Sequence, residues 1–150
     1  MRVFDVMSEK VSKISANASV KEAARMMAED NVGFLPVEED DRLIGTLTDR
    51  DLVLRCLAQN KDGTARVRDV MTHGVCYCFE DEDLDAVIDN MAEQQIRRMP
   101  VVNAQKRLTG VLSLADAARI YSPMAAGIAY SGVTSPGGLH AGDQNSRWSR

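Results

Sequence analysis

The chain has 150 residues, of which 45% are hydrophobic and 27% charged, with a net charge of −4 at neutral pH. These values are typical of a soluble globular protein with one compact domain or two small domains that share a core. No block of Lys or Arg is present, which argues against sequence-independent nucleic-acid binding. The N-terminus lacks an apolar h-region, and no apolar run approaches the roughly 20 residues that span a bilayer. We therefore predict a cytoplasmic protein without membrane or nucleic-acid partners.

The first predicted elements are a short strand over residues 11–14 and a helix after Ser19. Ser19 is a good N-cap, and Glu22 three residues later completes a capping box. Apolar residues then recur at the spacing of one helix face, at Val20, Ala23, Ala24 and Met27. This face is expected to be buried.

Two strands over residues 34–38 and 43–48 follow, and they flank a turn of acidic residues. A last helix starts at Asp49, which gives residues 1–58 the order β-α-β-β-α. The polar segment 59–66 contains a glycine and is interpreted as a linker.

The second half of the chain repeats this order of elements. A strand is predicted over residues 75–79, and a helix begins after the N-cap Asp83. The apolar face of that helix is formed by Leu84, Val87, Ile88 and Met91. Strands over residues 99–103 and 108–113 precede a last helix that starts at Leu114.

Short motifs show that the two halves are copies of one another. In order, the matches are VFDVMS at 3–8 with VRDVMT at 67–72, LPV at 35–37 with MPV at 99–101, LIGTLT at 43–48 with LTGVLS at 108–113, and Asp51 with Asp116. Such ordered matches indicate an internal duplication. A copy of about 55 residues is too small to bury much surface alone. We predict an α/β (α+β) fold in which two pseudo-symmetric repeats, residues 1–58 and 67–121, pack sheet to sheet.

Beyond residue 121 the composition changes. Residues 122–150 are rich in Gly, Ser and Ala and show no sustained apolar period, so they are predicted to form a flexible tail. Truncation after Tyr121 is then expected to leave the stability unchanged. The apolar stretch 124–130 leaves open that this part docks on a partner.

The three cysteines, Cys56, Cys76 and Cys78, form an odd number without a disulfide framework. The C-x-C pair and His73 leave a zinc site open, but the only other histidine is His140, near the C-terminus. A buried free cysteine behaves as a small hydrophobe. We favour that interpretation and predict no metal site.

The paired Asp-Val-Met starts, the two Pro-Val strands and the two Gly-x-x-(Thr/Ser)-x-x-Asp segments resemble the CBS-domain pair of stand-alone bacterial type. The resemblance covers about residues 1–121. It implies a regulatory module that binds an adenosine ligand (AMP, ADP, ATP or S-adenosylmethionine) in the clefts between the repeats. It also implies a homodimer whose ligand-dependent change is detected by an unidentified protein partner. No cofactor and no catalytic residue are expected, since there is no nucleophile–His arrangement and no phosphate loop of the Walker type.

Thr48 and Ser113 each end a strand and open a helix, and Asp51 and Asp116 follow three residues later. A helix N-terminus suits a phosphate, and a carboxylate can accept both hydroxyls of a ribose. The resemblance implies ribose binding by the two aspartates and phosphate or sugar contacts by the two hydroxyls. The same pattern also caps a helix. The alternative function is therefore a structural or protein-interaction module with empty clefts.

Arg97 and Arg98 precede the Pro-Val strand of the second copy, where the resemblance implies phosphate contacts. The first copy has Gly33 and Phe34 there. We expect two unequal sites, with tighter phosphate binding at Asp51, to which the two arginines are expected to contribute. A solvated pair on an edge strand is the alternative. The candidate nucleotide-binding residues are Ser12, Ile14, Thr46, Thr48, Asp51, Cys76, Arg97, Arg98, Ser113 and Asp116.

Overall fold

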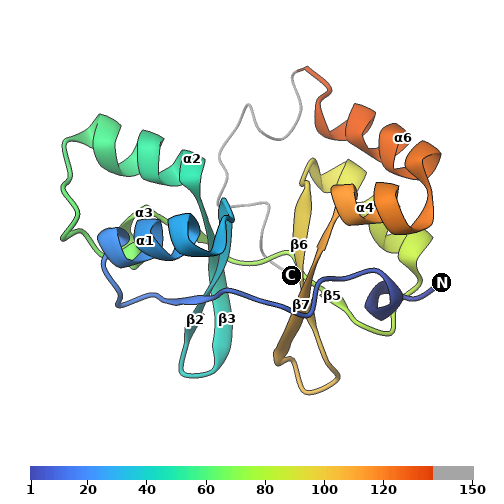
Figure 1. Cartoon of the computed structure of the whole chain (residues 1–150), viewed down its shortest axis with the longest axis horizontal. Helices are drawn as coiled ribbons and strands as arrows, with labels where there is room; N and C mark the ends of the chain where they lie inside the picture. Colours follow the sequence, from blue (N-terminus) through green and yellow to red (C-terminus); the bar gives the residue numbers. More distant parts are fainter. Residues whose placement is uncertain (137–150) are drawn as a thin grey trace. The chain divides into compact units, whose positions relative to one another are not determined.

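The structure is a computed structural model in which residues 1–136 are described. Its residues group into two compact units (Figure 1). Unit 2 comprises Ser12–Val75, and unit 1 comprises Met1–Val11 together with the chain from Cys76 onward. Each unit contains one sheet covered by helices, so the predicted mixture of strands and helices is confirmed.

Unit 2 is built on a four-stranded sheet in the order β1-β2-β3-β4. Its strands are β1 (Ile14–Ser15), β2 (Phe34–Glu39), β3 (Arg42–Thr48) and β4 (Thr72–His73). Its helical segments are α1 (Val20–Asp30), α2 (Asp49–Asp51), η2 (Leu52–Cys56), η3 (Leu57–Gln59) and α3 (Val67–Val70). The β1–β2 pair is parallel, and the β2–β3 and β3–β4 pairs are antiparallel.

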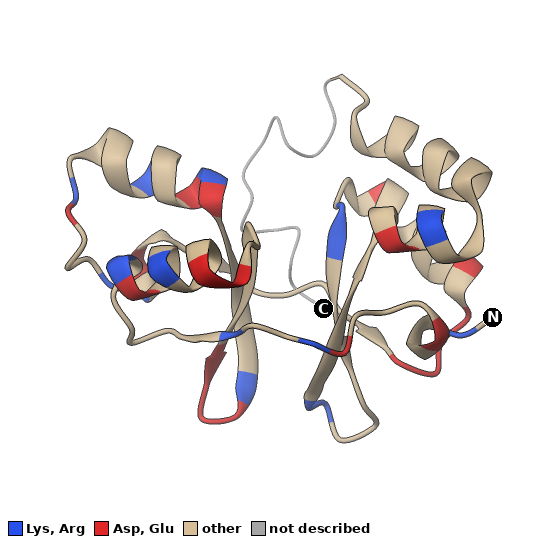
Figure 2. Cartoon of the chain, in the orientation of Figure 1, with Lys and Arg blue, Asp and Glu red and all other residues tan. Residues whose placement is uncertain are grey.

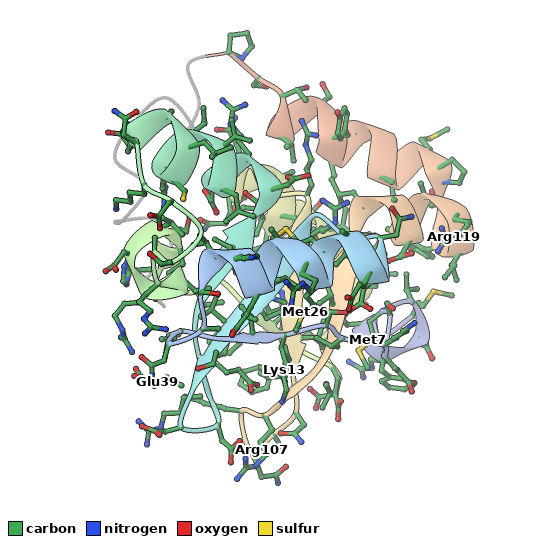
Figure 3. The ribbon with its side chains drawn as sticks, turned by 60° about the vertical axis from the view of Figure 1, so that its left-hand side comes forward. Met7, Lys13, Met26, Glu39, Arg107 and Arg119 are labelled. Carbon is green, nitrogen blue, oxygen red and sulfur yellow. The ribbon has the colours of Figure 1, made fainter. Side chains whose placement is uncertain are left out.

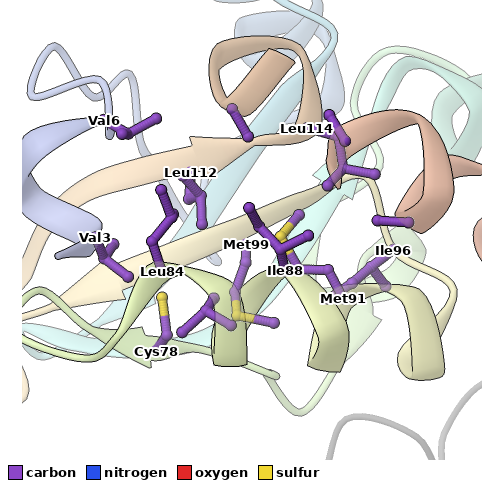
Figure 4. Close-up of a cluster of buried hydrophobic side chains, with 14 of the residues drawn as sticks. Val3, Val6, Cys78, Leu84, Ile88, Met91, Ile96, Met99, Leu112 and Leu114 are labelled. Atoms are coloured by element: carbon purple, nitrogen blue, oxygen red, sulfur yellow. The ribbon is translucent and has the colours of Figure 1, made fainter. Parts of the chain in front are cut away.

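Unit 1 has a three-stranded sheet in the order β5-β6-β7. Its strands are β5 (Cys78–Phe79), β6 (Arg98–Val102) and β7 (Leu108–Ser113). Its helical segments are η1 (Val3–Asp5), α4 (Leu84–Gln94), α5 (Leu114–Asp116), η4 (Ala117–Tyr121) and α6 (Pro123–Val133). Val3, Leu84, Met99 and Leu112 lie together in its core, each fully buried (Figure 4).

The two long crossover helices begin where the sequence predicts. The Ser19 hydroxyl accepts the Glu22 N–H at 3.2 Å, and the Asp83 carboxylate accepts the Ala86 N–H at 3.2 Å. The predicted apolar face of α4 is buried throughout. In α1 the prediction was wrong at Ala24, which is exposed, because the buried face is narrow there and ends with Val20, Ala23 and Met27.

The opening segment of each repeat packs outside the compact unit that holds the rest of that repeat. In unit 1, Ser8 and Val111 exchange two backbone hydrogen bonds, with N···O distances of 2.9 and 3.0 Å. An added Cβ at Gly110 would lie 2.6 Å from the Met7 sulfur, and one at Gly45 would lie 2.5 Å from the Thr72 carbonyl oxygen in unit 2. The glycine of each Gly-x-x-(Thr/Ser)-x-x-Asp segment is therefore needed for this close backbone approach.

The first strand of each copy is shorter than predicted. Only Ile14 of residues 11–14 is in β1, and only Cys78–Phe79 of residues 75–79 are in β5. Each of these strands has just two paired positions with the neighbouring strand. The residues just before these strands are not paired in the sheet. The β-branched composition could not predict where the pairing begins.

The predicted flexible tail is corrected over its first part, because Pro123–Val133 forms the helix α6 (Figure 1). Ser122 caps it by accepting the Ala125 N–H at 3.1 Å, and Ala126, Ala129 and Val133 are buried in the unit 1 core. The apolar period was missed because small residues form it and the opposite face is apolar as well. Residues 137–150, with His140, lie outside the described residues. Among residues 1–136, none of the helices combines the length and apolarity needed to cross a membrane.

Candidate functional site

The β3–α2 junction in unit 2 is closed by reciprocal hydrogen bonds. The Thr48 N–H donates to Asp51 Oδ2 at 2.9 Å, and the Asp51 N–H donates to Thr48 Oγ1 at 3.1 Å. α2 continues directly into η2 and η3, so the helical chain runs from Asp49 to Gln59. The capping function predicted for this motif is therefore present, and it fixes the Asp51 carboxylate at the start of the helical run.

Asp51 is a carboxylate in an unfavourable environment, since its side chain is only 14% exposed. Burial is the largest influence and raises its pKa above the ordinary value, against the hydrogen bonds from Thr48 and the charges of Arg55 and Arg50, which lower it. Arg55 Nε lies 3.9 Å from Asp51 Oδ1. A half-buried acid whose pKa is raised is typical of functional sites.

The β7–α5 junction in unit 1 repeats the arrangement with a serine. The Ser113 hydroxyl donates to Asp116 Oδ2 at 2.6 Å, and the Asp116 N–H donates to Ser113 Oγ at 3.0 Å. The Asp116 side chain is 17% exposed, and the Arg119 guanidinium contacts its other oxygen. Figure 3 labels Arg119 on the helical segment that follows α5. Both junctions thus place a hydroxyl and a carboxylate side by side.

Arg97 and Arg98 lie next to the Ser113–Asp116 junction of their own unit. Arg98 is the register partner of Ser113 across β6 and β7, so the two side chains share a sheet face. The Leu114 N–H donates to the Arg97 carbonyl oxygen at 3.0 Å. The Arg97 guanidinium carbon lies 5.1 Å from the centre of the Tyr130 ring. That the two arginines serve Asp51, as the sequence analysis expected, stays a prediction.

The other candidate residues lie at different places in the two units. Thr46 is buried two positions before Thr48, and alternation along β3 puts both side chains on one face. The Ser12 hydroxyl donates to Asp30 Oδ2 at 2.6 Å, at the end of α1. Ile14 and Cys76 belong to the cores of unit 2 and unit 1. The structure thus brings together Thr48 with Asp51, and Ser113 with Asp116 and Arg98.

Sequence reasoning missed two arginines, Arg55 and Arg119, that contact the two candidate aspartates. Arg55 follows Asp51 by four residues and Arg119 follows Asp116 by three, which is the spacing of side-chain pairs on a helix. Arg55 also donates to the Met71 carbonyl oxygen at 2.9 Å. The charge spacing was a usable signal in both copies.

All three cysteines are buried free thiols. Cys76 and Cys78 lie in the unit 1 core and Cys56 in the unit 2 core, in agreement with the interpretation as small hydrophobes. Within residues 1–136, no three His, Cys, Asp or Glu side chains are grouped as metal ligands.

Comparison with known families matches the duplicated pattern directly. The model of the CBS domain matches twice, over residues 3–57 and 67–122. The chain belongs to the CBS-domain family. The first match includes the Thr48–Asp51 junction, and the second includes the Ser113–Asp116 junction. The helix α6 begins just after the second match ends.

Known CBS proteins are similar over most of the chain. The CBS domain-containing protein YhcV of Bacillus subtilis is 40% identical over 116 residues, which are 77% of this chain and 82% of that protein. A crystal structure of the CBS domain pair of protein MJ0100, in complex with 5′-methylthioadenosine and S-adenosyl-L-methionine, has a TM-score of 0.73 and 30% identity, covering 83% of this chain and 98% of that chain.

Two further solved structures carry different ligands. CBSX2 in complex with AMP has a TM-score of 0.69 and 27% identity, covering 82% of this chain and 97% of that chain. Hypoxic Response Protein I with two coordinated zinc ions has a TM-score of 0.72 and 34% identity, covering 80% of this chain and 98% of that chain. Ligand binding is thus found among the structural neighbours, which supports a regulatory ligand-binding module.

Proposed function

We propose that this CBS pair is a non-catalytic sensor of adenine nucleotides such as AMP, ADP or ATP. The observation that carries the proposal is the half-buried Asp51 carboxylate, held beside Thr48 at a strand–helix junction although burial disfavours its charge. A second carboxylate, Asp116, occupies the matching place in the other unit. Structural neighbours in complex with AMP and with S-adenosyl-L-methionine support an adenosine ligand.

Each residue of the proposed site has a chemical role. Asp51 and Asp116 accept hydrogen bonds from ribose hydroxyls, and Arg97 and Arg98 bind phosphate oxygens with their planar guanidinium groups. Thr46, Thr48 and Ser113 add hydroxyl donors. The adenine ring lies along the chain at Ser12 and Ile14 or at Cys76.

Nucleotide binding regulates by shifting a population. The nucleotide favours one arrangement of the module, proposed to be a homodimer, and a protein partner binds the two arrangements differently. S-adenosylmethionine is the competing ligand, and a capped scaffold that only binds proteins is the second candidate function. The closed capping bonds at both junctions favour that second candidate.

Calorimetric titration with AMP, ATP, S-adenosylmethionine and adenosine tests the proposal. We expect adenine nucleotides to bind with micromolar to millimolar Kd, about −8 to −4 kcal/mol, and incubated ATP to remain intact. The double variant Asp51→Asn/Asp116→Asn should bind AMP much more weakly than the wild type. Asp89→Asn is the matched control, because Asp89 is an exposed aspartate on α4 that belongs to neither junction.

Two results would contradict the proposed function. One is a folded wild-type protein that binds none of these compounds, which would favour the scaffold function. The other is ATP hydrolysis that copurifies with the protein and disappears in a site variant. Light scattering in the presence and absence of AMP tests the homodimer.

A further inference from the structure

The helix α6 is anchored to unit 1 although it lies outside the CBS pattern. Ala126, Ala129 and Val133 are buried in the unit 1 core. The Gln95 side-chain amide, which follows α4, donates to the Gly132 carbonyl oxygen at 3.0 Å. An added Cβ at Gly132 would lie 3.2 Å from the Ala92 Cβ, so the two helices approach closely there. α6 is therefore a fixed element of the unit.

One side chain of α6 reaches a candidate ligand-binding residue. The Tyr130 ring lies beneath the Arg97 guanidinium, with 5.1 Å between the guanidinium carbon and the ring centre. No charged residue occurs in the sequence of α6, which is tan along its length in Figure 2. The contact to Arg97 thus rests on the ring face, which attracts a guanidinium through its quadrupole.

A guanidinium held over one ring keeps its binding capacity. The group has five N–H donors, and a single ring on one side leaves donors free for a phosphate. Arg97 has a long side chain, which loses many rotamers when it binds a phosphate. A ring that already restricts those rotamers reduces this loss, and such preorganisation increases affinity without any new contact to the ligand.

We propose that Tyr130 is a positioning residue for Arg97, and that α6 thereby completes the phosphate-binding part of the nucleotide site. The inference rests on the proposed function, since it requires a nucleotide phosphate near Arg97. It adds a residue and an element that the CBS repeats do not contain. By linkage, the bound phosphate also favours the docked position of α6.

Titrations with AMP and adenosine, which differ by the phosphate, test the inference. Tyr130→Ala should weaken AMP binding about two- to fivefold, which is the range expected for a partly exposed cation–π contact. The affinity for adenosine should stay unchanged. Tyr130→Phe should restore the affinity for AMP, because the ring face remains. Ile128→Ala is the matched control: Ile128 is a 70% exposed residue on the same helix, and its removal should change neither ligand.

A double-mutant cycle separates positioning from a loosened helix. In an Arg97→Ala background, Tyr130→Ala should have no further effect on AMP. Equal weakening of AMP and adenosine by Tyr130→Ala, or additive losses in the cycle, would overturn the inference while leaving the proposed function intact. A wild-type protein that binds neither AMP nor adenosine would overturn both.

Discussion

The two strand–helix junctions have the same backbone hydrogen bond but carry different charged side chains. At both junctions the first helical N–H donates, at 3.0 Å, to the carbonyl oxygen of the residue just before the neighbouring strand. The donors are Asp49 and Leu114, and the acceptors are Gly33 and Arg97. In unit 2, Gly33 leaves room for a carboxylate, because an added Cβ would lie 2.7 Å from Asp49 Oδ2. In unit 1 that carboxylate is replaced by the buried Leu114.

The duplication has therefore kept the capping scaffold and changed the ionisable groups around it. The unit 2 junction carries two carboxylates and two guanidiniums, from Asp49, Asp51, Arg50 and Arg55. The unit 1 junction carries one carboxylate and three guanidiniums, from Asp116, Arg97, Arg98 and Arg119. Within each unit taken by itself, Coulomb attraction for a phosphate is therefore stronger at the unit 1 junction than at the unit 2 junction.

The largest expected difference between the units follows removal of α6. Truncation after Tyr121 should destabilise unit 1 by roughly 3 kcal/mol, since burial of Val133 alone contributes about 1.5–3 kcal/mol and two alanines add to it. For a unit of this size the Tm should fall by roughly 12–24 °C. Circular dichroism measures the melting, and truncation after residue 136 is the control.

Amide hydrogen exchange identifies the unit that loses stability. Protection in α4 should fall, whereas protection in β2 and β3 of unit 2 should persist. A truncated protein with the melting temperature of the wild type would support the sequence-based prediction of a flexible tail.

Binding variants determine which aspartate the arginines serve. The sequence assigned Arg98 to the Asp51 site, whereas the structure makes Arg98 the cross-strand neighbour of Ser113. If the cross-strand position decides the assignment, Arg98→Ala and Asp116→Ala should weaken AMP binding at the same site about tenfold or more, because a charge-assisted hydrogen bond contributes about 1.5–3 kcal/mol. Titration calorimetry of the single and double variants measures this. If Arg98→Ala and Asp51→Ala weaken AMP binding at the same site, the assignment from sequence is supported instead.

The smallest expected effects are on stability at the two carboxylates. Because burial raises the pKa of Asp51 above its unfolded value, its ionised form destabilises the fold at neutral pH, and this cost is relieved as the pH falls through the raised pKa. Asp51→Asn keeps an acceptor for the Thr48 N–H, so it should melt at or above the wild-type temperature at pH 7. The advantage should vanish as the pH approaches about 4.

Asp116→Asn should lower the stability at pH 7, which is the opposite of the effect expected for Asp51→Asn. It removes the ion pair with Arg119, whose side chain is 69% exposed, at a cost of about 0–1 kcal/mol. Thermal melts of both variants between about pH 4 and 7 test the pair. If Asp51→Asn were less stable than the wild type by a constant margin over this range, burial would not be the main influence on Asp51.

The sequence predicted the parts of the fold that depend on local signals. The helix caps at Ser19 and Asp83, and the strands flanked by turns, require only neighbouring residues. The internal repeat predicted the paired Thr48–Asp51 and Ser113–Asp116 junctions. The family assignment was confirmed because those repeated motifs are specific.

The rest depends on contacts between distant residues. That Met7 packs on Gly110, or Ala126 on the unit 1 core, requires the tertiary arrangement. α6 lacks the polar face by which amphipathic helices are detected. For the same reason the Tyr130–Arg97 contact, across 33 positions of the sequence, had no signal at either residue.

The interleaved packing of unit 1 has a consequence for synthesis on the ribosome. Ser8 bonds to Val111, so the segment that carries the buried residues Val3 and Val6 cannot complete its packing until about 100 further residues have been made. At about 5–20 residues per second this interval is roughly 5–20 s. Unit 2, made of one continuous stretch, can complete its sheet during that time. Val3 and Val6 then remain in water as a nascent apolar segment, within reach of chaperones that bind the emerging chain.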